Sequence, residues 1–324
     1  MADTDPSRLG LVNATGSADN ALFLKKFSGE VLRAYKKAIM ILPKVRQRRI
    51  MDGKSAQFPA IGRAAASYHQ AGTNILDTGG GILTEVKHGE QEIFVDDLLV
   101  SGAMIDRLDE LKNHYDARAP YAEEFAQALA DKTDQQLLQV IGLGAAAAVS
   151  GTGITVDYLG GFEDVDAGYA NDADTILAGL QAVSEQFDAN HVPTMNRFAA
   201  MDSVHYNLLV DNKELIDRDF GGERNGVFAD GTVFKAWGFT LIKTQNMPTG
   251  VVGAETGVRN TYDGDFSNTE VLCWHRDSIG SVALMDVQTE MGYFMEFQGH
   301  LLLAKKAVGH GPLKEGGMAA LKSA

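Results

Sequence analysis

The sequence contains one cysteine, Cys273, among its 324 residues, and it has no long apolar run. A single cysteine excludes any disulfide framework within the chain. No apolar stretch approaches the ~20 residues that a membrane-spanning helix requires. Residues 1–18 are polar and lack the apolar stretch of a secretory signal peptide. These absences predict a protein without a membrane partner that stays in the cytoplasm where it is made.

The sequence also lacks the usual patterns of a catalytic or metal site. The eight histidines are spread along the chain, and none shows HExxH spacing or a second histidine or cysteine three to five residues away. There is no GxSxG nucleophile elbow. Cys273 lies in an apolar, strand-like run in which His275 shares its face, and a buried, unreactive thiol is the favoured interpretation. We therefore expect no catalytic, cofactor-binding or metal-binding residues, and a structural role.

Three short motifs imitate ligand sites, but their surroundings do not fit. Residues 142–147 spell GxGxxA, yet a predicted long helix precedes them where a dinucleotide site needs a strand, so a hinge is favoured. Residues 53–55 match the end of a Walker loop, but Arg48 stands where that loop needs glycine. Residues 163–168 are acidic, but a calcium loop there has neither its glycine nor its final glutamate. We expect a turn at each of the last two motifs.

Charge is unevenly distributed along the chain. The net charge of -14 argues against a freestanding nucleic-acid-binding protein. Residues 25–54 nevertheless contain ten basic and two acidic residues, so this segment carries +8 and the remainder carries -22. Either the segment is a solvated face, or it is a basic arm that contacts an acidic surface of a neighbouring copy or nucleic acid.

The N-terminal region predicts an arm. Residues 1–18 are rich in Gly, Ser, Asp and Asn and predict a disordered tail. Leu24, Phe27, Val31 and Tyr35 then recur at helical spacing, which predicts an amphipathic helix over about 21–40. A helix so early in the chain has little of its own sequence to pack against. We expect it to dock on another element or on another subunit.

The next part of the chain predicts a long excursion and a long helix. Residues 55–63 and 85–95 read as two strands joined by a polar, glycine-containing stretch. A structureless loop of this length is uncommon in a compact domain and usually has a function. Residues 120–143 predict the longest helix, with Pro120 in its first turn. The Gly/Ala-rich residues 142–161 mark the best candidate for a domain boundary.

The second half of the chain predicts an α+β arrangement. A helical stripe from Ile176 to Phe187 follows the cap candidates Asp172 and Asp174 and ends at Asn190. Strands are predicted at 197–201, around Trp237 to Leu241, at 271–274 and at 282–284, with a short helix at 202–210. No repeat of fixed period is present.

Several motifs occur in the order found in one viral family. They are Ala-Leu-Phe-Leu-Lys-Lys-Phe at 21–27, Gly-Lys-Ser-Ala-Gln-Phe-Pro at 53–59, Asn-His-Tyr-Asp at 113–116, Asp-Ser-Ile-Gly at 277–280, and Gly-His-Gly-Pro-Leu-Lys at 309–314. Through them the chain resembles the major capsid proteins of short-tailed autographivirus (T-seven-like) podophages over nearly its whole length. The likeness is loosest around 145–175.

The resemblance implies an α+β fold, the tailed-phage major capsid fold first seen in the Hong Kong coliphage. It implies an N-terminal arm at 1–52 and an extended β-hairpin loop at 53–92. It further implies a peripheral domain at 93–149 and 281–324, which contains the long spine helix, and an axial domain at 150–280.

The resemblance also implies a function. The chain is expected to assemble into pentamers and hexamers of an icosahedral head that encloses double-stranded DNA, within the host bacterial cytoplasm. Its expected partners are other copies of itself, a separate scaffolding protein, a portal protein at one vertex and the packaged DNA. No cofactor is expected. No lysine lies between Lys54 and Lys87, so the extended loop has no amine for an isopeptide crosslink, and a non-covalent shell is expected.

Two alternatives remain open at this point. An encapsulin-like nanocompartment shell protein shares the fold but encloses enzyme cargo, and a soluble enzyme of unrecognised type is a weaker possibility. The residues expected to face another subunit or the genome are the following: Lys25, Lys26, Arg33, Lys36, Lys37, Lys44, Arg46, Arg48, Arg49, Phe58, Arg63 and Tyr68.

Overall fold

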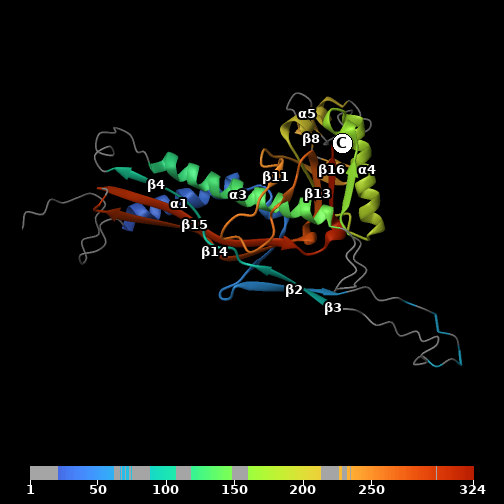
Figure 1. Ribbon diagram of the computed structural model, residues 1–324, viewed down its shortest axis with the longest axis horizontal. Helices are drawn as coiled ribbons and strands as arrows, with labels where there is room; N and C mark the ends of the chain where they lie inside the picture. Colours follow the sequence, from blue (N-terminus) through green and yellow to red (C-terminus); the bar gives the residue numbers. More distant parts are fainter. Residues whose placement is uncertain are drawn as a thin grey trace, which may run out of the picture. The chain divides into compact units, whose positions relative to one another are not determined.

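Figure 1 shows the secondary-structure elements of the computed structural model. The chain divides into two compact units. The first comprises Met1–Met40, Asp97–Asp134 and Met285–Val308, and the second comprises Ile41–Asp96, Gln135–Leu284 and Gly309–Ala324. The structure describes residues 21–61, 66, 68, 69, 71, 72, 74, 88–106, 118–147, 160–212, 226, 227, 232, 233, 235–296 and 298–324. The division into arm, loop, peripheral and axial parts stays a prediction.

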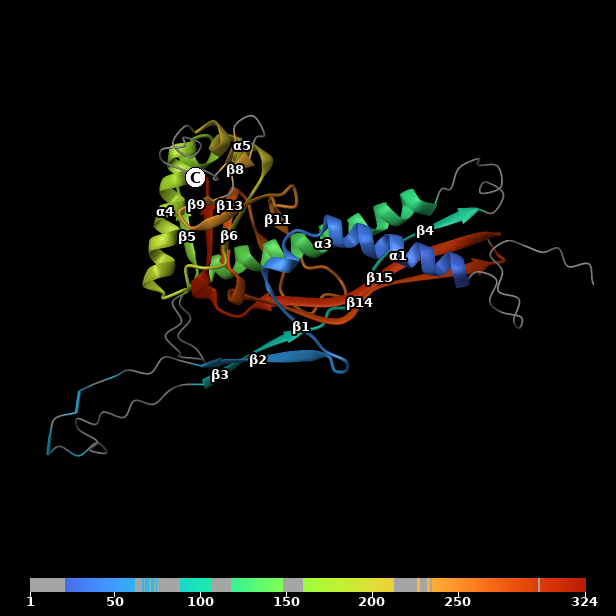
Figure 2. The same ribbon diagram turned by 180° about the vertical axis from the view of Figure 1, so that it is seen from behind.

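Within the described residues, the first unit combines helix α1 and part of helix α3 with parts of a β-sheet. Helix α1 (Ala21–Ala38) runs beside the N-terminal part of α3 (Arg118–Ala146), as Figures 1 and 2 show. Strand β4 (Leu99–Asp106) pairs antiparallel with β15 (Gly299–Pro312), so that Asp106 lies opposite Gly299 and Leu99 opposite Lys306. The full sheet has the order β1-β14-β15-β4, where β14 is Ile279–Phe294. The helices predicted near 21–40 and 120–143 are confirmed.

The core of the first unit includes the N-terminal helix. Val31 and Tyr35 of α1 are buried against apolar side chains of α3, β14 and β15. The buried partners are Ala122, Phe125, Ala126, Leu129, Ala130, Val287, Leu302 and Ala304. The expected docking of this helix on another element is therefore confirmed for Val31 and Tyr35, and that element belongs to the same chain.

The second unit is built on a six-stranded sheet with the order β5-β16-β13-β6-β10-β9. These strands are β5 (Phe162–Val165), β16 (Met318–Lys322), β13 (Thr269–His275), β6 (Arg197–Met201), β10 (Phe239–Lys243) and β9 (Lys235–Ala236). The central strand β13 is antiparallel to both of its neighbours, whereas β10 runs parallel to β6. The strands predicted at 197–201 and 271–274 are confirmed.

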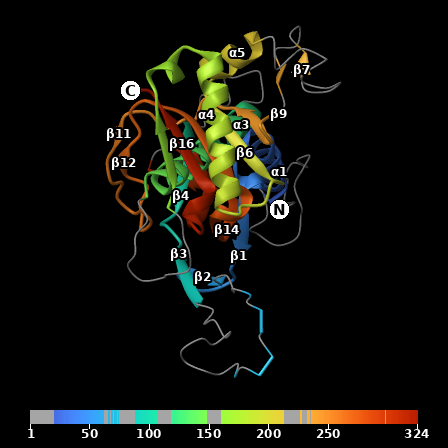
Figure 3. The same cartoon turned by 90° about the vertical axis from the view of Figure 1, so that its right-hand side faces the viewer.

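This sheet is buried on both faces. Val271 and Cys273 of β13 point to a cluster covered by α4 (Ala173–Ala189) and α5 (Ser203–Asp211). Leu272 and Trp274 point to the opposite cluster, which is covered by Leu137, Leu138 and Ile141 of α3. Figure 3 shows α4 crossing in front of β6 and β16. Strands covered on both faces read as continuous apolar runs, as β13 does.

The GxGxxA segment is part of α3, so the predicted hinge at 142–147 is wrong where the helix continues to Ala146. A Cβ on Gly142 would lie 2.8 Å from the ring of Phe266, and one on Gly144 would lie 2.4 Å from Sδ of Met318. The glycines therefore allow the helix to approach the sheet closely. The predicted domain boundary beyond residue 147 lies outside the described residues until Gly160.

Helix α4 begins and ends where the sequence predicts. Asp172 is its N-cap and accepts a hydrogen bond from the backbone N–H of Asp174, and Asn190 is its C-cap. Two strand predictions need correction. β10 starts at Phe239, because Trp237 occupies a tight turn with φ 47°. The strand predicted at 282–284 is part of the 16-residue β14, and its neighbour β15 was not predicted.

The remaining described elements are short. β2 (Ser55–Ile61) pairs with β3 (His88–Phe94), β7 (Gly226–Val227) with β8 (Thr232–Val233), and β11 (Val251–Val252) with β12 (Gly264–Asp265). Strand β1 is Arg46–Arg49, and the single-turn helices are η1 (Leu42–Lys44), η2 (Ala167–Ala170), η4 (Arg276–Ser278) and η5 (Glu315–Gly317).

Candidate functional surface

The hairpin β2–β3 and the basic strand β1 contain most of the described residues that the sequence assigns to an interface in the second unit. In the hairpin, Ser55 lies opposite Phe94 and Ile61 opposite His88, as the two predicted strands require. Strand β1 pairs parallel with β14, and all four of its side chains are exposed. Figure 2 shows β2 and β3 together as one extended pair. A two-stranded hairpin is only marginally stable alone, so its contacts with the rest of the unit decide whether it keeps a fixed direction.

Two predicted interface arginines bind this hairpin within the chain. The guanidinium carbons of Arg46 and Arg48 each lie 5.7 Å from the centroid of the Phe58 ring, a cation–π distance. Arg48 Nη1 also donates to the carbonyl of Gln57 at 2.5 Å. Phe58 itself is buried, 4% exposed. Phe58 therefore packs within its own chain, and Arg46 and Arg48 connect β1 to β2.

The other predicted surface residues do not form one cluster. Lys36 and Lys37 are exposed in the last turn of α1, where positive charge suits the negative end of a helix. Arg33, Arg49 and Lys54 are exposed, Lys44 is half-buried, and Tyr68 is fully exposed. The side chains of Lys25 and Lys26, and all of Arg63, lie outside the described residues. Their assignment to an interface stays a prediction.

A polar cluster holds the base of the hairpin. One carboxylate oxygen of Asp96 accepts from the backbone N–H groups of Arg259 (2.8 Å) and Asn260 (3.1 Å) and from Asn260 Nδ2 (3.0 Å). Its other oxygen accepts from the Tyr262 hydroxyl at 2.6 Å. The Asn260 amide also donates to the carbonyl of Phe94 and accepts from its N–H. Burial, together with the neighbouring Asp96 carboxylate, raises the pKa of Tyr262, which keeps its hydroxyl protonated and donating.

The Gly-His-Gly-Pro motif packs against the same base. The backbone N–H of His310 donates to the Tyr262 hydroxyl at 2.9 Å. A Cβ on Gly309 would lie 1.8 Å from the carbonyl oxygen of Phe94, so only glycine allows this approach. A Cβ on Gly280 would lie 2.6 Å from Cδ1 of Ile93. We name Asp96, Asn260, Tyr262 and Gly309 the hairpin anchor. The sequence signalled only Gly309, through its motif.

A buried lysine lies in the first unit. Lys306 on β15 is 3% exposed, donates to the hydroxyl of Tyr35 on α1, and lies 4.8 Å from the centroid of that ring. Desolvation lowers the pKa of Lys306 to about 8, and the nearby carboxylates of Asp286 and Asp134 oppose this shift. Asp134 on α3 also accepts from the backbone N–H of Met40 at 2.8 Å. These contacts fix the end of α1.

Two properties of the described titratable side chains concern chemistry at a site: whether they cluster as metal ligands, and whether the Cys273 thiol is reactive. No group of three or more His, Cys, Asp or Glu side chains in the described ranges is placed to hold a metal ion. Burial raises the pKa of the Cys273 thiol, which keeps it protonated, as the sequence predicted. In the acidic run, Asp166 caps η2 and Asp164 accepts from the Tyr169 hydroxyl at 2.5 Å. None of the helices within the described residues has an apolar stretch long enough to span a bilayer.

Comparison with known proteins decides among the classes left open. Residues 57–322 match the model of the family described as "Gp10A-like: Major capsid protein". The chain belongs to this family. The major capsid protein of Enterobacteria phage T3 is 29% identical to it in an alignment that covers 91% of this chain and 89% of the phage protein. The predicted resemblance to podophage capsid proteins is therefore confirmed.

Solved structures confirm the predicted fold. The capsid structure of the cyanophage P-SCSP1u is similar with a TM-score of 0.77 and 34% identity, covering 100% of this chain and 99% of that chain. A virus-like particle from Pyrococcus furiosus matches with a TM-score of 0.55 and 15% identity over 93% of this capsid protein and 99% of its own chain. At 15% identity, the similarity to the virus-like particle shows the shared fold alone, so it does not favour the nanocompartment alternative.

Proposed function

We propose that the chain is the major capsid protein of a phage and forms the icosahedral shell of the virion. The similarity to the cyanophage P-SCSP1u capsid carries this proposal, because it spans the whole chain at 34% identity. The nanocompartment alternative is not favoured, because the family model describes a major capsid protein.

Assembly into pentamers and hexamers requires one chain to occupy non-identical environments. The two compact units supply separate bodies for such contacts, with the hairpin β2–β3 extending from residues of the second. We assign residues 1–52 to the arm, 53–92 to the extended loop, 93–149 with 281–324 to the peripheral domain, and 150–280 to the axial domain. Many weak contacts repeated over a shell give high overall stability without a strong single interface.

The further partners belong to the same proposal. They are a scaffolding protein that directs assembly, a portal protein at one vertex, and double-stranded DNA inside. The basic residues near Arg46 and Arg48 meet an acidic surface of a neighbouring copy or the DNA. All four side chains of β1 are exposed, which supports this role. Arg46 and Arg48 also contact Phe58, so the remaining surface of each guanidinium is the part that would meet a neighbouring copy or DNA.

Negative-stain microscopy of the purified protein, alone and co-expressed with the neighbouring reading frames, tests the proposal. We expect closed particles or capsomers, and DNA inside particles taken from infected cells. A chain that remains monomeric at every concentration, even beside its scaffold, contradicts it. Enzyme cargo inside particles that exclude DNA would instead support the nanocompartment.

The shell is proposed to be non-covalent. Residues 55–86 contain no lysine, so an extended-loop amine cannot form an isopeptide bond there. We expect denaturing gels of mature particles to show only monomers. A ladder of covalent oligomers that persists after boiling in reductant and detergent contradicts this part of the proposal without affecting the capsid assignment.

A further inference from the structure

One end of the six-stranded sheet carries two exposed large apolar side chains. Met195 is 76% exposed and Trp237 is 52% exposed. Each lies two residues before the start of its strand, β6 for Met195 and β10 for Trp237. These strands are parallel neighbours, with Phe198 opposite Thr240. Neighbouring strands lie about 4.8 Å apart, so the register brings both side chains to the same end of the sheet. We call this pair the sheet-end patch.

Trp237 occupies a backbone conformation that a tryptophan rarely adopts. It forms, with Gly238, the two-residue turn between the paired residues Ala236 and Phe239. Both turn residues have positive φ, 47° and 84°, the pattern of a type I′ turn, which favours Asn-Gly. A bulky residue with positive φ is an outlier, and such outliers concentrate at functional sites. The fold alone would be better served by asparagine, which indicates that the indole has another use.

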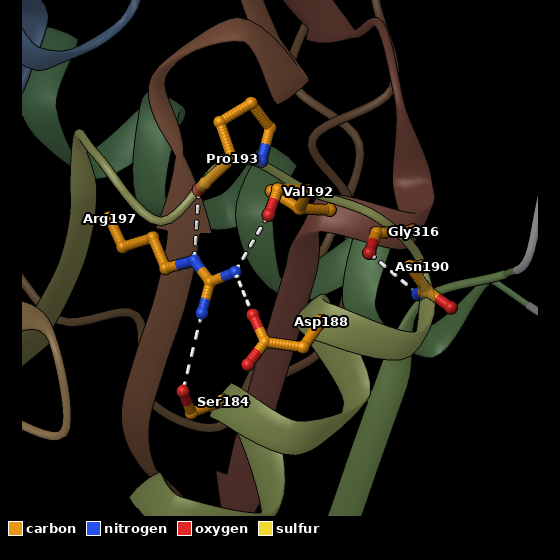
Figure 4. Close-up of polar contacts among 7 residues, drawn as sticks. All are labelled: Ser184, Asp188, Asn190, Val192, Pro193, Arg197 and Gly316. Carbon is orange, nitrogen blue, oxygen red and sulfur yellow. Dashed lines mark hydrogen bonds and ion pairs between the residues drawn. The ribbon is translucent and has the colours of Figure 1, made fainter.

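Met195 lies in a loop whose backbone carbonyls are hydrogen-bonded to Arg197. The guanidinium of the buried Arg197 donates to the carbonyl oxygens of Pro193 (3.0 Å) and Val192 (2.7 Å) and to Oδ1 of Asp188 (2.5 Å), as Figure 4 shows. In the same view it also donates to Ser184 Oγ at 3.2 Å. The side chain of Arg197 thus holds the backbone of the loop that precedes it. Because the backbone of this loop is already hydrogen-bonded, binding of a partner at Met195 orders the side chain without also having to order the loop.

The charges around the patch indicate a protein partner. His275 lies opposite Arg197, so Arg276 and Asp277 follow at the same end of the sheet, and both are exposed. The backbone N–H of Arg276 donates to the carbonyl of Asn196 at 3.2 Å. Binding to nucleic acid requires a basic surface, whereas this end carries both signs of charge. Methionine and tryptophan are enriched at the centres of protein interfaces.

We propose that the sheet-end patch is a contact surface for a second copy of this chain. The proposal rests on the capsid function proposed above, since copies of the same chain surround each subunit in a shell. Trp237 enters a site on the neighbouring copy, and Met195 packs beside it. The strained turn persists because it presents the indole at a fixed angle.

The two tryptophans of the chain allow a test without mutation. Trp274 is fully buried and Trp237 is half-exposed, so acrylamide quenching of the folded protein reports mainly on Trp237. We expect the quenching constant to fall several-fold when the unassembled protein forms particles. Particles in which the indole remains as quenchable as before overturn the inference alone. Failure of the wild type to form any particle overturns the proposed function and this inference with it.

Two substitutions of Trp237 distinguish an effect on folding from an effect on the contact between copies of the chain. Trp237→Asn gives the turn its preferred Asn-Gly sequence, so we expect an unchanged or higher melting temperature but an at least tenfold higher concentration for particle formation. Trp237→Phe is the matched control, keeps an aromatic ring and should assemble within a few-fold of wild type. Assembly of Trp237→Asn at the wild-type concentration overturns the inference, and so does a lowered melting temperature that accounts for its defect.

Discussion

The two units of this capsid protein obtain their cores in different ways. The second unit buries both faces of a six-stranded sheet, and its two clusters consist of apolar side chains. The first unit closes its core with the N-terminal helix α1, and places Lys306 at 3% exposure beside Tyr35. Neither cluster of the second unit contains a residue of α1 or a lysine. Removal of α1, or a change of pH across the pKa of Lys306, should therefore act on the core of the first unit.

Removal of residues 1–40 should have the largest effect on this comparison. The deletion takes Val31 and Tyr35 out of the first core and leaves the second core unchanged. We expect native hydrogen exchange in peptides of β13 and α4, loss of protection in β4, and no particles by microscopy. Normal particles from the shortened chain would show that α1 is dispensable. Loss of protection in β13 would show that the units do not fold separately.

A change of pH should have the second-largest effect, because it should change the free energy of unfolding of the first unit more than that of the second. The pKa of Lys306 falls from 10.5 to about 8, so between pH 8 and 10 the unfolded state binds more protons than the folded one. The free energy of unfolding of the first unit therefore rises with pH over this window, by ~2–3 kcal/mol. Burial raises the pKa of Tyr35 above its ordinary value of 10.0, which opposes the rise as the pH approaches and passes 10. Hydrogen exchange of β4 and β15 at pH 8 and 10 measures the change.

Lys306→Met is the control for the predicted rise of the unfolding free energy with pH. Methionine has a similar length without the amine. After correction for the base-catalysed intrinsic exchange rate, the free energy of unfolding of the first unit should therefore no longer rise between pH 8 and 10. Cys273 in the second unit has a raised pKa, so its contribution has the opposite sign above pH 9 and is shared by wild type and variant. An equal slope in wild type and variant would mean that Lys306 does not control the pH response.

Periodicity and capping predicted the elements whose side chains pack locally. The stripe of α4 and its cap Asp172, the helix α1 and the run of β13 agree with the structure. The far part of β14 and all of β15 were not predicted. In β15, Lys305 and Lys306 interrupt the apolar pattern, and β4, one of its two neighbours in the sheet, lies about 200 residues away in sequence.

The contacts that fix the functional elements could not be predicted for a related reason. Asp96 and Asn260 are separated by 164 residues, and neither has a local pattern that announces the other. Burial of Lys306 also contradicts the usual exposure of lysine. Phe58 was expected at an interface because its motif was recognised, but the motif does not show that Arg46 and Arg48 cover its ring.

Within the second unit, the hairpin should be easier to loosen than the sheet. Tyr262→Phe removes the hydrogen bond to Asp96 and the one accepted from His310, and a buried group left unpaired costs ~1–3 kcal/mol. We expect faster exchange in β2 and β3 and unchanged exchange in β13. Tyr169→Phe is the matched control, because its hydroxyl donates to Asp164, far along the chain from the hairpin. Equal effects of both variants on β2 would show that the anchor does not hold the hairpin.

The basic segment should give the smallest effect per residue. Exposed ion pairs contribute ~0.2–1 kcal/mol each and are screened beyond ~8 Å at physiological salt. A shell repeats them, so raised salt should lower the particle yield measurably. Substitution of Lys44, Arg46, Arg48 and Arg49 by glutamate should reduce the yield, while the circular dichroism of the monomer stays unchanged.

Two double variants distinguish the contribution of the β1 arginines to holding the hairpin from the contribution of positive charge in general. Arg46→Ala with Arg48→Ala should speed exchange in β2, because the contacts with Phe58 and the bond to Gln57 are lost. Lys36→Ala with Lys37→Ala removes the same charge from α1 and should leave β2 unchanged. If both pairs lower the yield equally and neither affects β2, the contribution is general charge. If the arginine pair alone lowers the yield and speeds exchange in β2, β1 supports assembly by holding the hairpin in place.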